Sequence, residues 1–121
     1  MQYMLLIYDA ESTWFGMSED ERNGVMREYF QFTEELRSAG KHVAGDALQP
    51  LETAKSVRLR DGEVKTTDGP FAETKEALGG YYLVDVDSEA EALEWAAKIP
   101  SARFGTIEVR PVVVFPVEAS A

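Results

Sequence analysis

The pattern of apolar and polar positions predicts four strands for a main sheet. Residues 3–8 (YMLLIY) are apolar on both faces of a pleated strand, which is typical of a central strand covered on each side. Residues 42–48 predict a shorter strand, in which Gly45 indicates a bulge or a close backbone approach. Residues 81–86 are rich in aromatic and β-branched side chains. The last strand, 106–115, contains a proline and is therefore expected at a sheet edge or with a bulge.

A helix is predicted between the first two strands. Ser18 and Glu21 have the spacing of a capping box, and Gly40 is suited to end the helix in a left-handed conformation, which gives bounds of about 19–39. Apolar side chains recur on one face at spacings of three and four residues, at Val25, Tyr29, Phe32 and Leu36.

A second helix is predicted before the last strand. Ser88 and Glu91 repeat the capping-box spacing, and Pro100 ends the helix. We expect its core face to carry Leu93, Ala96 and Ala97.

A hairpin is predicted over residues 56–67, where the dipeptide Asp61-Gly62 is suited to a two-residue turn. This turn fixes the register of the two strands. The expected cross-strand pairs are Leu59 with Val64 and Arg60 with Glu63.

The order strand, helix, strand, hairpin, strand, helix, strand predicts an α+β ferredoxin-like split βαβ plait with an inserted β-hairpin, as one domain over residues 1–121. Both helices would cover one face of the sheet. Because the chain has no third layer for the other face, we expect a homodimer that packs sheet against sheet. The residues expected in buried sheet faces, toward the helices or toward the partner, are Tyr3, Leu5, Ile7, Tyr82, Val84, Ile107 and Val109.

Composition narrows the function classes. With 12 Lys and Arg against 22 Asp and Glu, the net charge of −10 disfavours nucleic-acid binding and favours neutral or cationic ligands at long range. The absence of cysteine excludes disulfides, thiolate nucleophiles, iron–sulfur clusters and Cys-type zinc sites. A metal could use oxygen ligands only, and we expect neither a metal nor another cofactor. The N-terminal apolar run resembles a strand rather than a signal peptide or a membrane span, so we expect a cytoplasmic protein.

The most unusual segment is 68–80, DGPFAETKEALGG, which groups charged residues around one aromatic side chain. Pro70 is suited to begin a short helical turn, and Phe71 is expected to anchor the segment in the core. Asp68 could accept backbone N–H bonds. The charged side chains that the turn would display are Glu73, Lys75 and Glu76. The alternative interpretation is a capped connection with a solvated charged face.

The motif Asp68-Gly69-Pro70-Phe71 and the run GGYYLVDVDSEAEALEWAAKIP (79–100) resemble the YCII-related family, in the branch named after its Asp-Gly-Pro-Phe (DGPF) motif. The segments 43–50 and 107–112 are also similar to it, so the resemblance covers nearly the whole chain. It implies a dimeric α/β barrel of ferredoxin-like halves and no established reaction. Genes of this branch often neighbour those of alternative sigma factors, which implies a transcription-related protein partner.

Some members of the family carry a His–Asp pair in a cleft, and this sequence departs from that pattern. Its single histidine, His42, precedes Asp46 by four residues, which is about 13 Å along an extended strand. The two side chains therefore form no local pair, and we do not expect catalysis by His42.

Two functional hypotheses remain open from the sequence. The first is an enzyme for isomerase- or lyase-like proton transfer on a small molecule, with a cleft between the sheet and the 68–76 turn. Its general base would be Asp68, Glu73 or Glu76. Lys75 or Arg110 would orient an anionic substrate.

The second hypothesis is a non-catalytic module that binds a metabolite in the dimer cleft or a protein partner. Aromatic residues such as Tyr8 and Trp14 would line its pocket. Trp14 and Phe15 are two large aromatic residues in a loop that also contains glycine, which suggests a lid or an interface.

Overall fold

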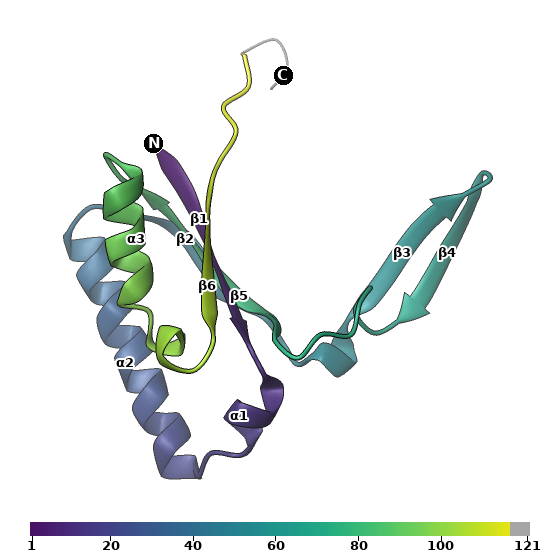
Figure 1. Cartoon of the computed structure of the whole chain (residues 1–121), viewed down its shortest axis with the longest axis horizontal. Helices are drawn as coiled ribbons and strands as arrows, with labels where there is room; N and C mark the ends of the chain where they lie inside the picture. Colours follow the sequence, from purple (N-terminus) through teal and green to yellow (C-terminus); the bar gives the residue numbers. More distant parts are fainter. Residues whose placement is uncertain (117–121) are drawn as a thin grey trace.

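The computed structural model describes residues 1–116 and contains a four-stranded antiparallel sheet in the order β2-β5-β1-β6 (Figure 1). This order, with the first and third strands of the plait at the centre, is that of a ferredoxin-like fold and confirms the predicted architecture. The strands of the sheet are β1 (Gln2–Asp9), β2 (His42–Ala47), β5 (Ala77–Asp85) and β6 (Thr106–Pro111). The helices are α1 (Glu11–Phe15), α2 (Glu19–Ser38) and α3 (Glu89–Ala97), with 3-10 turns η1 (Leu51–Thr53) and η2 (Pro100–Arg103).

Helices α2 and α3 lie on the same side of the sheet and form the core with it (Figure 1). Phe32 and Leu36 of the predicted stripe on α2 pack there, with Tyr29 partly buried against them, while Val25 is buried outside this cluster. On α3 the predicted face is wrong in part, because Leu93 is 53% exposed and Ala97 is exposed. Ala96 is buried as predicted, and the other buried side chains at this helix are Ala92 and Ile99. Small alanines on the inner face let α3 approach the sheet closely, while Leu93 points outward.

The predicted capping box is complete at α2 and only half formed at α3. Ser18 and Glu21 form the complete capping box of α2. At α3 the hydroxyl of Ser88 accepts from the backbone N–H of Glu91, but the Glu91 carboxylate accepts from the N–H of Asp87 instead.

The predicted hairpin is confirmed as β3 (Lys55–Arg60) and β4 (Glu63–Asp68), with Leu59 opposite Val64. Asp61 and Gly62 have φ values of 52° and 78°, as a type I′ turn requires. The hairpin projects away from the main sheet as an arm (Figure 1). Its apolar side chains, Val57, Leu59 and Val64, are exposed.

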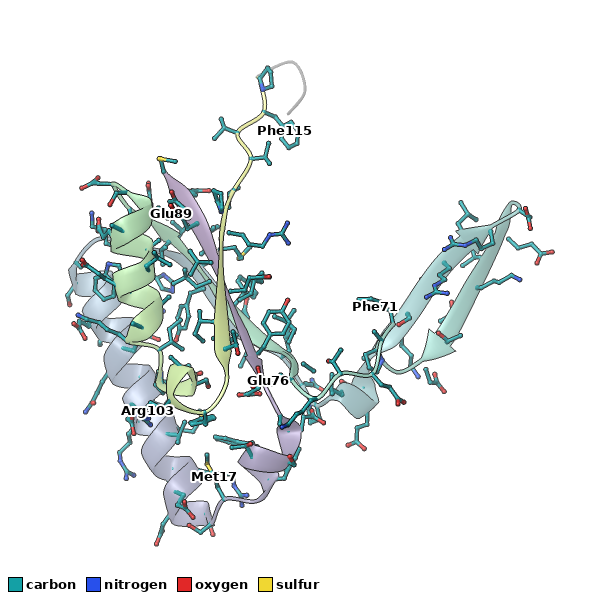
Figure 2. All side chains as sticks on the ribbon, viewed as in Figure 1. Met17, Phe71, Glu76, Glu89, Arg103 and Phe115 are labelled. Carbon is teal, nitrogen blue, oxygen red and sulfur yellow. The ribbon has the colours of Figure 1, made fainter. Side chains whose placement is uncertain are left out.

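The segment that joins the arm to β5 differs from the prediction. Residues 69–76 form no helical turn, and Phe71 is 83% exposed rather than anchored in the core. Figure 2 shows Phe71 beside the base of the arm, away from the helices. The segment is held at the arm because Gly69 donates to the Ala54 carbonyl and accepts from the Ser56 hydroxyl. Asp68 pairs with the Lys55 ammonium rather than capping a turn.

Strand β6 ends at Pro111, four residues short of the predicted end at 115. Within residues 1–116 it pairs with β1 alone, which begins at Gln2, and the N–H of Val112 makes the last bond, to the Gln2 carbonyl. Residues 113–116 therefore lie beyond the reach of the sheet. Phe115 in this tail is exposed (Figure 2).

Among residues 1–116, helices cover one face of the sheet and leave the other without a helix against it. Side chains toward the helices include the predicted set, of which Ile107 and Val109 are partly buried. The opposite face has no helix against it among residues 1–116. Its apolar side chains are half-buried at Met4, Leu6, Tyr8, Tyr81 and Leu83. In the same range of residues, no helix is long and apolar enough to cross a bilayer.

Candidate functional site

A groove of about 480 Å³ opens between α2 and the sheet edge formed by β2. It exists because α3 packs over β1 and β6, which leaves the β2 side of the sheet to α2 alone. The helix presents a second stripe here, one position beside its core stripe, with the spacing of successive turns. The stripe consists of Met26, Phe30, Thr33 and Arg37, and Tyr29 joins it from the core side.

In the floor of the groove, Gly45 lets the Tyr82 ring pack directly against β2. A Cβ at Gly45 would lie 2.8 Å from the ring of Tyr82 and 3.0 Å from the carbonyl oxygen of Tyr81. This close approach was predicted from the glycine in the strand, whereas the irregular pairing of β2 with β5 lies before it, between His42 and Ala44. The Tyr82 ring packs edge-on against Phe32 and His42. The floor is therefore aromatic and rigid.

One end of the groove is closed by polar groups from three separate elements. Asp9 ends β1, Ser101 lies in η2, and Tyr29 lies on α2. The hydroxyls of Tyr29 and Ser101 are hydrogen-bonded at 2.5 Å, and Ser101 is 3% exposed. Trp14 of helix α1 forms the wall at this end of the groove. The Glu11 carboxylate fixes the position of α1. That carboxylate accepts from the backbone N–H of residue 51 at 2.8 Å.

The environment of Asp9 favours the protonated form of its carboxyl. Burial raises the pKa of Asp9, the hydroxyl of Ser101 opposes that shift, and the charges of Glu76 and Glu11 add to it. Burial likewise raises the pKa of the Tyr29 phenol. A protonated carboxyl can donate a hydrogen bond to a ligand and then transfer its proton to the ligand, and the carboxylate that remains can take a proton back.

The other end of the groove is open and basic. Arg37 lies two helical turns beyond Tyr29, His42 begins β2, and both side chains lie near Tyr82. The hydroxyls of Thr33 and Tyr82 are hydrogen-bonded at 2.8 Å between the two ends. Burial raises the pKa of the Tyr82 phenol, and the charge of Arg37 partly opposes this.

A second cavity, of about 590 Å³, lies between the base of the arm and the sheet. It brings together four residues that the sequence singled out, namely Tyr8, Pro70, Phe71 and Glu76. The Glu76 carboxylate accepts from the hydroxyl of Thr106 at 2.8 Å, at the end of β1 (Figure 2). The predicted cleft beside the 68–76 turn therefore has a physical counterpart.

The other predicted site residues are dispersed. Asp68, Glu73 and Lys75 are exposed and line neither of the two cavities. Arg110 is exposed on β6, opposite Met4 on the face without helices. Trp14 lines the groove rather than the second cavity, and it belongs to a short helix where a loop was expected.

Sequence reasoning missed four residues of the groove. Asp9 is the first acidic residue after a buried strand, and a polar residue at a strand end was a usable signal. Arg37 continues a second helical stripe that was overlooked beside the stronger core stripe. Tyr29 was assigned to the core alone. Ser101 carried no signal, because only the fold brings η2 beside the end of β1.

Among residues 1–116, no three His, Asp or Glu side chains are grouped so that they could hold a metal ion.

Comparison with known proteins gives one family and one relative. A family model described as a YCII-related domain matches residues 1–116. An uncharacterized protein of Rhizobium meliloti (strain 1021) is 38% identical over 117 residues, which cover 95% of this chain and 94% of that protein. The name of this relative assigns no activity to it.

Proposed function

This chain belongs to the YCII-related domain family, and we propose that it is a homodimer that binds a small molecule in the groove between α2 and β2. The observation that carries the proposal is the groove itself, with apolar walls and a few polar groups that converge at its ends. A volume of about 480 Å³ falls within the usual range of small-molecule sites. The alternative place for a ligand is the second cavity, at the 68–76 turn.

A labelling experiment distinguishes the two cavities, because the chain contains no cysteine and an introduced thiol is the only one present. Ala47→Cys places the thiol in the groove, and Ala72→Cys places it in the second cavity. Ala90→Cys, on the exposed side of α3, is the control. Each variant is coupled to a bulky maleimide and screened by thermal shift against a panel of small metabolites.

We expect compounds that stabilise the unmodified protein to lose their effect only when Ala47→Cys is labelled. A ligand at one hundred times its Kd adds about 2.7 kcal/mol of stability, which a thermal shift detects. Loss of the effect with Ala72→Cys alone would move the site to the second cavity. A screen with no stabilising compound would contradict a ligand-binding role for the groove.

The homodimer is proposed to form through the face of the sheet that has no helix against it. Its half-buried apolar side chains form a continuous patch over the central strands. Burial of such a patch against a second copy is the usual way to complete a two-layer α+β domain. The exposed apolar side of the arm and the tail at 112–115 lie at the two ends of this face, where a second copy could also cover them.

Light scattering tests the dimer. We expect a dimeric mass at micromolar concentration for the natural chain and a monomeric mass for Leu83→Asp, with a native far-UV spectrum in both. Leu93→Asp, on the outer side of α3, is the matched control and is expected to stay dimeric. A monomeric natural chain would contradict the proposal.

Two finer assignments belong to the same proposal. The sequence Asp68-Gly69-Pro70-Phe71 supports membership of the DGPF branch of the family. A cytoplasmic location is proposed with it, and fractionation of cells that express the chain would test that location.

A further inference from the structure

We propose that the groove is built for an aromatic monocarboxylate, with the carboxylate at Arg37 and His42 and the ring toward Asp9 and Ser101. This inference rests on the proposed binding role of the groove and specifies the chemical class of its ligand.

The first argument is the state of Arg37. The chain carries 22 acidic residues, and some of its arginines are held by the protein. Arg103 binds both oxygens of the Glu28 carboxylate, and Arg22 donates to backbone carbonyls. Among residues 1–116, Arg37 is exposed and makes no ion pair and no side-chain hydrogen bond, as is also true of Arg27, Arg58 and Arg110. Arg37 differs from these three because it lines the groove. A guanidinium with all five donors available is suited to a carboxylate in two-point geometry.

The neighbouring hydroxyls have no proton to offer a ligand. The Thr33 hydroxyl donates to the carbonyl oxygen of Tyr29 at 2.9 Å, which uses its single proton. In the hydrogen bond between Thr33 and Tyr82, the Tyr82 phenol must therefore be the donor. Both protons are committed within the protein. The donors that remain at this end of the groove come from Arg37 and His42, whose imidazole also makes no side-chain hydrogen bond within the described chain.

Strand β2 contributes one acidic residue to the groove, Asp46, and this residue does not compete with a ligand for Arg37. The Asp46 carboxylate accepts from the Tyr81 phenol at 2.9 Å, and both side chains lie on the opposite face of the sheet. The net charge of −10 slows the approach of an anion, but it acts from a distance and is screened within about 8–10 Å at ordinary salt. The local charge at Arg37 then decides which end group is bound.

The middle and far end of the groove select the rest of the molecule. Its walls carry the rings of Trp14, Tyr29, Phe30 and Tyr82, which favour a flat aromatic group. At the far end, Asp9 lies near the charges of Glu11 and Glu76, which would repel a second carboxylate. Tyr29 and Arg37 are eight residues apart on α2, or about 12 Å along the helix axis. One ring system with a short acidic side chain fits that length.

The test uses three probes that share one ring system. Indole-3-acetate carries the carboxylate, indole-3-acetamide is its neutral isostere, and tryptamine carries an ammonium group instead. Their dissociation constants are measured by calorimetry for the natural chain and for Arg37→Gln, Arg37→Lys and Arg27→Gln. Arg27 is the matched control, because it is an exposed arginine on the same helix that does not line the groove.

We expect the acid to bind at least tenfold more tightly than the amide, and tryptamine to bind most weakly. In Arg37→Gln, the dissociation constants of the acid and the amide are expected to differ by less than threefold. Arg37→Lys should restore part of the preference, and Arg27→Gln should leave it unchanged. Far-UV spectra and melting temperatures confirm that the variants are folded.

Three results would overturn the inference. Equal affinity for the acid and the amide would show that Arg37 does not select the carboxylate. An unchanged ratio of the two affinities in Arg37→Gln would show the same. A preference for tryptamine would show that the acidic end selects the ligand. Failure of all three probes to bind would exclude the aromatic class, while the labelling screen with Ala47→Cys judges separately whether the groove binds any small molecule.

Discussion

The hydrogen bond between Tyr29 and Ser101 is expected to couple α2 to η2 and to hold the closed end of the groove. Tyr29→Phe removes one hydroxyl and leaves the Ser101 hydroxyl, which is 3% exposed, without its phenol partner. Ser101→Ala removes the other hydroxyl. Neither change alters the packing of a ring or of the backbone.

The size of the effect follows from burial. A hydrogen bond contributes about 1 kcal/mol net, and a buried hydroxyl that loses its partner costs about 1–3 kcal/mol. We expect each single variant to lose about 1–2 kcal/mol of unfolding free energy. The double variant should lose about the same as one single variant, which corresponds to a coupling energy of about 1–2 kcal/mol.

Urea unfolding followed by tryptophan fluorescence measures these values. With a slope of about 1–3 kcal/mol per molar urea, a loss of 1.5 kcal/mol moves the midpoint by roughly 0.5–1.5 M. All four proteins are compared at one protein concentration, because dimerisation makes the midpoint concentration-dependent. Additive losses within about 0.3 kcal/mol, or no loss in Tyr29→Phe, would refute the coupling.

Three further predictions concern the floor, the closed end and the core. Gly45→Ala should lower the free energy of unfolding in urea by about 1–3 kcal/mol, because its Cβ would lie 2.8 Å from the Tyr82 ring. Gly79→Ala is the control and should lower it less, because its Cβ would lie 3.5 Å from the nearest atom. Equal losses in the two variants would contradict the close approach at Gly45. Burial raises the pKa of Asp9 above its ordinary value of 3.8, so its ionisation lowers stability as pH rises through the folded pKa. Asp9→Asn should therefore melt higher than the natural chain at pH 7 and lose that advantage below the ordinary value, and an opposite pH dependence would refute the sign. Leu36→Ala, at a position with 0% exposure, should cost about 2–5 kcal/mol by calorimetry, and a cost under 1 kcal/mol would contradict its burial.

The fold was largely predictable because its elements carry local signals. Asp61 and Gly62 specify a turn by their backbone preferences alone, and the register of the arm follows from that turn. Ser18 and Glu21 likewise set the start of α2 through bonds made within four residues. Features of this kind depend on near neighbours in the chain, which a single sequence contains.

The errors have a common physical origin, which is that they depend on contacts distant in the chain. Phe71 is aromatic and follows a proline, so a core anchor was a reasonable interpretation, but the arm holds it away from the helices. Val113 and Val114 have strand propensity, yet β6 ends before them because β1 offers no further partner. Leu93 was placed inward by hydrophobicity, although alanine fits the narrow space beneath α3 better.

The candidate site shows the same limit. The charged 68–76 turn was conspicuous in the sequence, and the structure gives it a cavity that holds Glu76 but not Glu73 or Lys75. The groove was missed because Asp9 and Ser101 are brought together only by the folding of β1 against η2. A residue such as Arg37 is noticeable only when its lack of a partner can be seen.

The most direct test of the account is an amide-shift titration of ¹⁵N-labelled protein with indole-3-acetate. If the groove is the ligand site, the largest shifts are expected at Thr33 on the helix side and at Gly45 and Gly80 on the sheet side. Residues of the second cavity, such as Phe71 and Glu76, should change little. Shifts confined to that second cavity, or no saturable shift at all, would contradict the central claim that the groove between α2 and β2 is the ligand-binding site.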